Sequence, residues 1–205
     1  GSLLDIDYGT YPFVTSSNTT VAGACTGLGI KPQSIGKVFG IFKAYCTRVG
    51  SGPFPTELDN DLGEEIRQIG REFGSTTGRP RRCGWMDLPA LKYACMLNGV
   101  TELFMMKTDV LNSFASLQLG VGYKLKSGES TQEFPYDLED IALPIYKEVD
   151  GWNTEIASDL NYEDFPVALK KYIEHIEAYL NVPVSVVSVG PDRTETLIRE
   201  ELVGF

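Results

Sequence analysis

The sequence predicts an α/β fold in which a mixed, largely parallel sheet is flanked by helices. The second half of the chain carries the pattern, in the order helix, strand, strand, helix, strand: 87–99, 100–106, 117–125, 162–182 and 184–187. Strands that alternate with helices usually form one sheet with the helices packed against it. Ligands of such sheets bind beyond the carboxyl ends of the strands. The residues that follow Met106 and Val187 are therefore candidate site residues.

The two helices of this pattern are supported by local signals. In the segment 87–99, Asp87 can cap the helix, Pro89 fits its first turn and Gly99 ends it. The segment 162–182 is amphipathic, because five apolar residues recur on one helical face: Leu169, Tyr172, Ile173, Ile176 and Leu180. Both helices are expected to pack on the sheet.

The remaining segments are assigned from spacing and turn residues. Residues 3–17 predict a short strand that runs into a polar loop, and 51–58 predict a loop fixed by two prolines. Residues 60–74 predict a helix with an acidic start. Residues 127–141 predict a polar connection or a small hairpin. Residues 34–50 predict a helix ended by a glycine, from the spacing of apolar residues: Ile35, Val38, Phe39, Ile41, Phe42 and Tyr45.

Composition and charge exclude several classes of function. The chain has 205 residues, 42% of them hydrophobic and 22% charged, which predicts one globular core with an appendage. A net charge of −10 argues against nucleic acid as a partner, because phosphate backbones require a basic face. No apolar run is long enough for a membrane span. The acidic balance also indicates that the few clustered basic residues serve a small anionic ligand.

The cysteines and the histidine indicate neither a zinc site nor a nucleophile. The four cysteines have no CxxC spacing, and scattered cysteines without an export signal predict reduced thiols in a cytoplasmic protein. His175, the one histidine, lies within the amphipathic helix between Glu174 and Glu177 and is interpreted as an ordinary helix residue.

Arginines are concentrated in the stretch STTGRPRRCGW, residues 75–85. Guanidinium groups form forked hydrogen bonds with carboxylates and phosphates. The hydroxyls of Thr76 and Thr77, beside a flexible Gly78, would also suit an anion. The alternative is a basic turn that pairs with acidic side chains of the protein itself, and the composition leaves both interpretations open.

Two strand ends carry residues that suit a flat ligand. After Met106, the carboxylate of Asp109 could accept hydrogen bonds from N1–H and the 2-amino group of guanine, while the stem of Lys107 lies along the base. After Val187, Gly190 would allow a close approach and Ser188 would add a hydrogen bond. The alternatives are an ordinary strand-end salt bridge or helix cap, and a plain turn.

Hydroxyl and amide side chains are frequent between residues 10 and 20. They could hold a phosphate without charge, and the alternative is a polar loop. The residues are Thr10, Thr15, Ser16, Ser17, Asn18, Thr19 and Thr20.

Six stretches of the chain, in this order, closely resemble the C-terminal half of the adenylosuccinate synthetases. They are GSLLDIDYGTYPFVTSSNTT, KAYCTRVGSGPFPTEL, EFGSTTGRPRRCGW, MMKTDVLNSF, GWNTEI and SVGPDRTETLI. The resemblance spans nearly the whole chain and implies part of a P-loop-NTPase-like large sheet whose N-terminal half is missing. It divides the 1–205 segment into IMP and aspartate loops, 1–100, and a guanine-binding part, 101–205.

The resemblance implies a GTP-dependent ligase of purine and AMP biosynthesis. In this family GTP phosphorylates the 6-oxygen of IMP, and the amino group of L-aspartate then displaces that phosphate, which gives adenylosuccinate, GDP and phosphate. The implied partners are IMP, L-aspartate, GTP and Mg²⁺, in a cytoplasmic homodimer that uses neither nucleic acid nor a membrane.

Roles for individual residues follow from the same resemblance. The implied IMP-binding residues are Thr15, Val49 and Arg79. The implied aspartate-binding residues are Ser75, Thr76, Thr77, Gly78, Arg79, Pro80 and Arg81. The implied GTP-binding residues are Arg81, Lys107, Thr108, Asp109, Ser188, Val189 and Gly190. One departure is Met106, which stands where the family usually has threonine.

The family's glycine-rich phosphate loop, catalytic aspartate and histidine, and magnesium ligands match no residue of this chain. The resemblance therefore assigns neither a catalytic residue nor a metal ligand here, and the isolated chain is expected to be inactive. The alternative is a stand-alone, noncatalytic module that binds a guanine nucleotide or a dicarboxylate.

Overall fold

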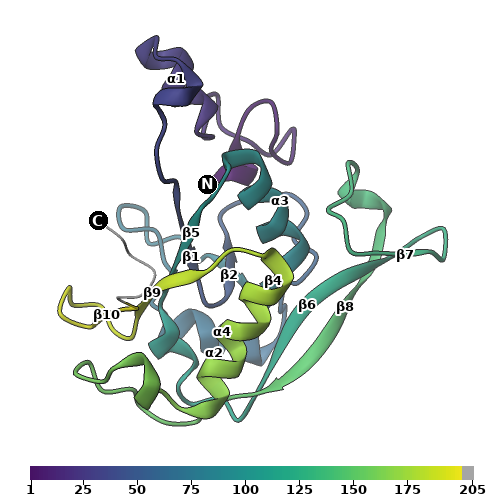
Figure 1. The fold of residues 1–205 in the computed structure, drawn as a ribbon. Helices are drawn as coiled ribbons and strands as arrows, with labels where there is room; N and C mark the ends of the chain where they lie inside the picture. The colour runs from purple at the N-terminus through teal and green to yellow at the C-terminus, as the bar shows by residue number, and fades with distance from the viewer. Residues whose placement is uncertain (200–205) are drawn as a thin grey trace.

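The central sheet has the strand order β1-β5-β9-β10 in the computed structural model, which describes residues 1–199 (Figure 1). β1, β5 and β9 are parallel, and β10 runs antiparallel to β9. The predicted mixed, largely parallel sheet is confirmed. Its strands are Phe39–Lys43 for β1, Glu102–Met106 for β5, Val184–Ser188 for β9 and Thr196–Ile198 for β10.

Two smaller sheets lie beside the central one. The larger is dominated by the antiparallel pairing of β6 with β8, which extends as a long ribbon on the right of Figure 1. It also contains β4, parallel to β6, and β7, antiparallel to β6. These strands are Met86–Asp87 (β4), Ser116–Leu125 (β6), Ser130–Thr131 (β7) and Ile141–Asp150 (β8). The third sheet pairs β2 (Cys46–Arg48) with β3 (Arg82–Gly84).

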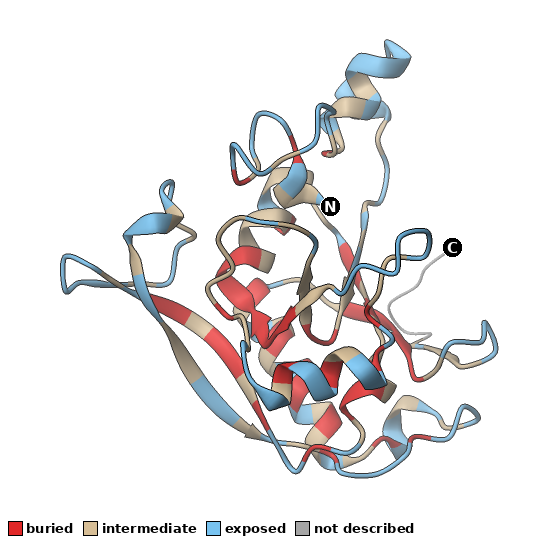
Figure 2. Ribbon diagram, turned by 180° about the vertical axis from the view of Figure 1, so that it is seen from behind, coloured by how far each residue is buried: buried red, intermediate tan, exposed pale blue. Residues whose placement is uncertain are grey.

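The longer helices cover the strands where the sequence predicts them. All five residues of the predicted apolar face of α4 are buried, and α3 has Asp87 as its N-cap and Gly99 at φ 60° after its last turn. In Figure 2 the buried residues concentrate on the inner strands and on these helix faces, whereas α1 contains no buried residue. The helices are Ala22–Leu28 (α1), Asp61–Ile69 (α2), Leu88–Asn98 (α3) and Val167–Leu180 (α4).

The prediction of a helix at residues 34–50 is wrong. Residues 39–43 form β1, which pairs with β5 along its whole length from Phe39↔Glu102 to Lys43↔Met106. Residues 46–48 form β2, which pairs with β3. Strand pairing overrides the local helical signal given by the three-and-four spacing of apolar residues.

The strand predicted within residues 3–17 is also absent from the described structure. The chain instead forms a short 3₁₀ helix at Ser2–Leu4 and a series of turns organised by the buried Asp5. Its carboxylate accepts hydrogen bonds from the backbone N–H groups of Asp7 at 3.0 Å and Thr19 at 2.6 Å. Although burial opposes the charge, these backbone donors hold the pKa of Asp5 below its ordinary value.

Other differences are smaller. α2 ends at Ile69, before the predicted end at residue 74, because the backbone turns at Gly70 and Arg71 takes a positive φ of 48°. The hairpin between β6 and β7 lies in the segment predicted as a polar connection or hairpin. All four cysteines are free thiols, as expected. No helix within residues 1–199 combines the length and apolar character needed to cross a membrane.

Candidate functional site

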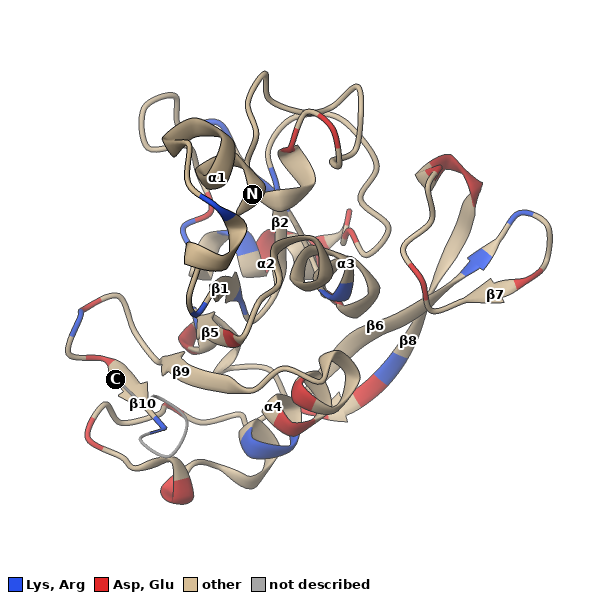
Figure 3. Cartoon of the chain, turned by 45° about the horizontal axis from the view of Figure 1, so that its top comes forward, with Lys and Arg blue, Asp and Glu red and all other residues tan. Residues whose placement is uncertain are grey.

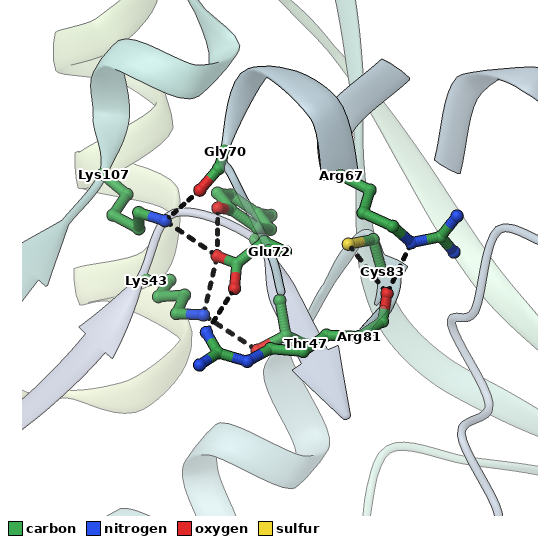
Figure 4. A network of polar contacts seen from close by, with 9 residues as sticks. Lys43, Thr47, Arg67, Gly70, Glu72, Arg81, Cys83 and Lys107 are labelled. Carbon is green, nitrogen blue, oxygen red and sulfur yellow. Dashed lines mark hydrogen bonds and ion pairs between the residues drawn. The ribbon is translucent and has the colours of Figure 1, made fainter. Parts of the chain in front are cut away.

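A buried carboxylate with three cationic partners lies at the carboxyl edge of the central sheet (Figure 4). Glu72 is fully buried, and its Oε1 accepts hydrogen bonds from Lys43 Nζ at 2.8 Å and Lys107 Nζ at 2.9 Å. The guanidinium of Arg81 donates to Oε2 at 2.7 Å, and the hydroxyl of Tyr45 donates to Oε1 at 2.5 Å. The ends of the parallel strands β1 and β5 bring the two lysines together.

The cluster keeps a positive excess, because three cations share one carboxylate. Burial disfavours the charged form of Glu72, but hydrogen bonds from its four donors lower its pKa to about 2. The side chains of Lys43, Lys107 and Arg81 remain 28%, 34% and 31% exposed. Figure 3 marks Lys or Arg on β1 and β2, whereas α4 and β8 carry both basic and acidic residues. The cluster thus presents local positive charge on an acidic protein and suits an anion.

Acid should remove the stabilisation that Glu72 provides. A carboxyl whose pKa is lowered by folding stabilises the fold above its ordinary pKa, here 4.5, and loses that contribution as the pH falls toward its folded value of about 2. We expect the free energy of unfolding to decrease across this window, and less steeply in Glu72→Gln. Urea unfolding at several pH values measures both slopes, and equal slopes would contradict this assignment.

A cavity of about 460 Å³ is lined by Asp109, which follows Lys107 by two residues in the sequence. It is lined by Ile69 at the end of α2, by the turn that contains Asp109, and by segments around Ile156 and Gly190. The Oδ1 atom of Asp109 is buried and has no hydrogen-bond partner among the described residues. Burial also raises the pKa of this carboxyl. An unpaired buried acceptor costs about 1–3 kcal/mol, so this position favours a ligand that brings its own donors.

The ends of β5 and β9 are tied together beside the cavity. The hydroxyl of Thr108 donates to the carbonyl of Ser188, and the hydroxyl of Ser188 donates to the carbonyl of Gly190 at 2.9 Å. Val189 N–H donates to the carbonyl of Glu195 at 2.9 Å, which closes the loop that follows β9. Of the predicted residues at the two strand ends, Asp109, Val189 and Gly190 line the same cavity.

The glycine in this wall has little space for a side chain. A Cβ at Gly190 would lie 2.3 Å from the carboxylate of Glu195. That carboxylate accepts a hydrogen bond from Asp192 N–H at 2.7 Å, so any side chain at 190 would disturb the loop.

Several residues of the cavity and the cluster were not predicted from the sequence. Ile69 lies outside the six stretches that carry the resemblance. Four other residues lie within those stretches but were assigned no role: Glu72, Asn112, Ile156 and Glu195. The amide of Asn112 has a fixed orientation, because an indole N–H can only donate: Trp152 Nε1 donates to Asn112 Oδ1 at 2.7 Å.

The predicted aspartate residues lie on an exposed loop that resembles a hairpin. Phe73 and Pro80 form an antiparallel bridge, and Gly74 N–H donates to the carbonyl of Arg79 at 2.9 Å. Gly78 has a φ of 63°, which glycine adopts without strain. All residues from 75 to 80 are exposed, so the loop presents its hydroxyls and Arg79 to solvent.

The arginines of this stretch divide between the two interpretations that the sequence left open. Arg82 follows the second interpretation: it forms a forked pair with Glu57, at 2.7 and 2.5 Å, and donates to the carbonyls of Gly50 and Gly52. Arg81 pairs with Glu72, and Arg79 is exposed. Pairing with the protein's own acids therefore holds for two of the three arginines.

The predicted IMP residues come from three loops, of which two are connected. Arg48 of β2 donates to the Thr10 hydroxyl at 3.0 Å, which holds the 10–13 turn near Val49. Thr15 is exposed and shares a hydrogen bond of 2.8 Å with the hydroxyl of Ser17. Within residues 1–199, no hydrogen bond or ion pair joins Arg79 to Thr15 or Val49.

The histidine and the acidic groups offer no metal centre in the described part of the chain. His175 is half-buried on α4, where burial lowers its pKa. No group of three or more His, Cys, Asp and Glu side chains in residues 1–199 could hold a metal ion.

Comparison with known proteins identifies the family. The sequence profile of the adenylosuccinate synthetases matches residues 1–197. The chain belongs to the adenylosuccinate synthetase family. It is 62% identical over 201 residues to the adenylosuccinate synthetase of Cytophaga hutchinsonii, covering 98% of this chain and 47% of the relative. It is 56% identical over 199 residues to that of Parabacteroides distasonis, covering 97% and 47%. The chain thus spans about half the length of the curated relatives it matches.

Solved structures of this family and of a related enzyme show the same fold. The fully ligated adenylosuccinate synthetase of Plasmodium falciparum superposes with a TM-score of 0.92 at 42% identity, over 97% of this chain and 48% of that one. The succinoaminodeoxyadenylate synthetase of cyanophage S-2L, bound to dGMP and dATP, has a TM-score of 0.57 at 20% identity, over 97% and 44%. At that identity the second likeness concerns the fold alone.

Proposed function

We propose that these 205 residues form the guanine-reading and substrate-holding part of a GTP-dependent ligase. The ligase joins IMP and L-aspartate and yields adenylosuccinate, GDP and phosphate in AMP biosynthesis. Membership of the family supports the reaction. The observation that carries the assignment to this chain is Asp109, which lines the cavity at the ends of β5 and β9 and whose buried Oδ1 has no partner among the described residues.

Guanine is the base that best matches this cavity. Its N1–H and 2-amino groups form a pair of parallel donors, which a carboxylate accepts together. Adenine presents no such pair and would leave the carboxylate of Asp109 unpaired. Val189 and Gly190, which line the cavity, would form the wall against the base, and Thr108 would support that wall through its hydrogen bond to the carbonyl of Ser188.

The positive cluster and the loop beside it would hold the other substrates. Arg81, on the cluster, faces the anionic part of GTP, and Arg79 with the hydroxyls of 75–77 binds the carboxylates of aspartate. Thr15 and Val49 contact IMP. In this division residues 1–100 supply the IMP and aspartate loops and 101–205 the guanine part. We also propose, from the family, a cytoplasmic homodimer whose Mg²⁺ is held by residues outside those described.

Calorimetric titration with GDP, IDP and ADP tests the guanine assignment. IDP lacks the 2-amino group, and ADP lacks both donors that Asp109 would accept. Losing a hydrogen bond to a charged group costs about 1.5–3 kcal/mol, so we expect GDP to bind about 10- to 100-fold more tightly than IDP. ADP should bind most weakly. Equal affinities for the three nucleotides, or no GDP binding, would contradict the proposal.

A further inference from the structure

We propose that Glu72 is a positioning residue that sets Lys107 and Arg81 relative to each other before a nucleotide binds. Among residues 1–199, its carboxylate is the one group that contacts both the lysine beside the base cavity and the arginine at the base of the exposed loop. The inference rests on the proposed function, because it concerns how the guanine site is held in its binding geometry.

Lys107 is fixed at both of its ends. Its backbone takes a positive φ of 62°, which turns the chain out of β5. Its Nζ donates to the carbonyl of Gly70 at 2.6 Å and to Glu72 Oε1 at 2.9 Å. The alkyl part of the Lys107 side chain is therefore held in one conformation, two residues before Asp109. Without Glu72, one of the two anchors of the amine is lost.

Arg81 is tied to the same residue by its backbone and by its side chain. Its N–H donates to the carbonyl of Glu72 at 2.9 Å, and its guanidinium donates to Glu72 Oε2 at 2.7 Å. The loop of residues 73–80 begins directly after Glu72 and ends directly before Arg81. One buried side chain thus links the end of α2, both ends of the loop and the end of β5 (Figure 4).

This arrangement has a consequence for binding that an ordinary structural ion pair lacks. A free lysine or arginine side chain loses about 1.5–2 kcal/mol of rotamer entropy when a ligand immobilises it. Where Glu72 already holds both cations, that loss occurs on folding and does not reduce affinity. Loss of Glu72 should therefore weaken all nucleotides alike, because Asp109, which reads the base, is unchanged.

The test compares Glu72→Gln with Glu57→Gln by calorimetric titration with GDP and IDP. Glu57 is a matched control, because it also pairs with an arginine of this stretch, Arg82, but contacts neither Lys107 nor Arg81. We expect Glu72→Gln to bind both nucleotides at least about tenfold more weakly with their ratio unchanged. Glu57→Gln should keep the affinity of the unmodified chain.

The outcomes separate this inference from the proposed function. If Glu72→Gln binds GDP as the unmodified chain does, or changes only the ratio of GDP to IDP, the inference is overturned and the proposed function stands. If the unmodified chain binds no GDP, both are overturned.

A second measurement needs no substitution of Glu72, in case that variant does not fold. The ¹⁵Nζ signal of Lys107, assigned from its loss in Lys107→Arg, should be visible in the ligand-free chain, because an amine with two fixed acceptors exchanges its protons slowly. It should persist when GDP is added. A signal that appears only with GDP would show that the nucleotide, and not Glu72, places the amine, and would overturn the inference.

Discussion

Asp109→Asn should weaken GDP binding by about 10- to 100-fold, since a charge-assisted hydrogen bond is worth about 1.5–3 kcal/mol. The asparagine oxygen can still accept from N1–H of guanine, but the amide nitrogen replaces the second acceptor with a donor. That nitrogen would face the 2-amino group of the base, which is also a donor. The buried position of Oδ1 keeps water from compensating for the mismatch.

The same substitution should favour a different base. Xanthine carries an oxygen at position 2, which can accept a hydrogen bond from the asparagine amide. We therefore expect the ratio of GDP to XDP affinity to reverse in Asp109→Asn, as measured by calorimetry. Asp137→Asn is the matched control, because Asp137 is exposed and caps a short helix between β7 and β8. Unchanged GDP affinity in Asp109→Asn would remove the guanine reader from our proposal.

The second large effect concerns turnover. The 205 residues on their own should release no phosphate from GTP above background. We expect the phosphate loop, catalytic aspartate and histidine, and magnesium ligands that the family resemblance implies to lie outside these residues. Phosphoryl transfer depends on a metal that neutralises the phosphates and on groups that orient the nucleophile.

A phosphate-release assay with GTP, IMP, L-aspartate and magnesium measures this result. The preparation must be free of full-length enzyme by mass spectrometry, and GDP titration of the same sample controls for a folded guanine site. Release that requires both IMP and aspartate would refute the expectation.

Local signals predicted those elements whose ends are fixed by their own residues. Asp87, Pro89 and Gly99 define α3 without reference to the rest of the chain. The segment at 34–50 has Gly50 as its one terminal signal, and pairing with β5 makes residues 39–43 a strand. β8 was not predicted, because it interrupts its alternation with Pro144 and contains no buried residue that would mark an apolar face.

The residues of the candidate site also differ in whether the sequence alone could predict them. Lys107 and Asp109 could be selected because they follow an apolar strand, where parallel sheets place ligands. Glu72 could not, because the stretch GREFGSTTG shows one acidic residue among polar neighbours. Its role depends on cations from positions 43, 81 and 107, which only the folded chain brings together.

The cavity beside Asp109 draws its walls from segments separated by more than a hundred positions, from Ile69 to Glu195. A ligand bound in this cavity would contact all of these segments and hold them together. Because the ligand would bind only the folded chain, it would have to dissociate before heat could unfold these segments or a protease could cut them. The free energy of unfolding of the chain would thus increase with the concentration of its nucleotide.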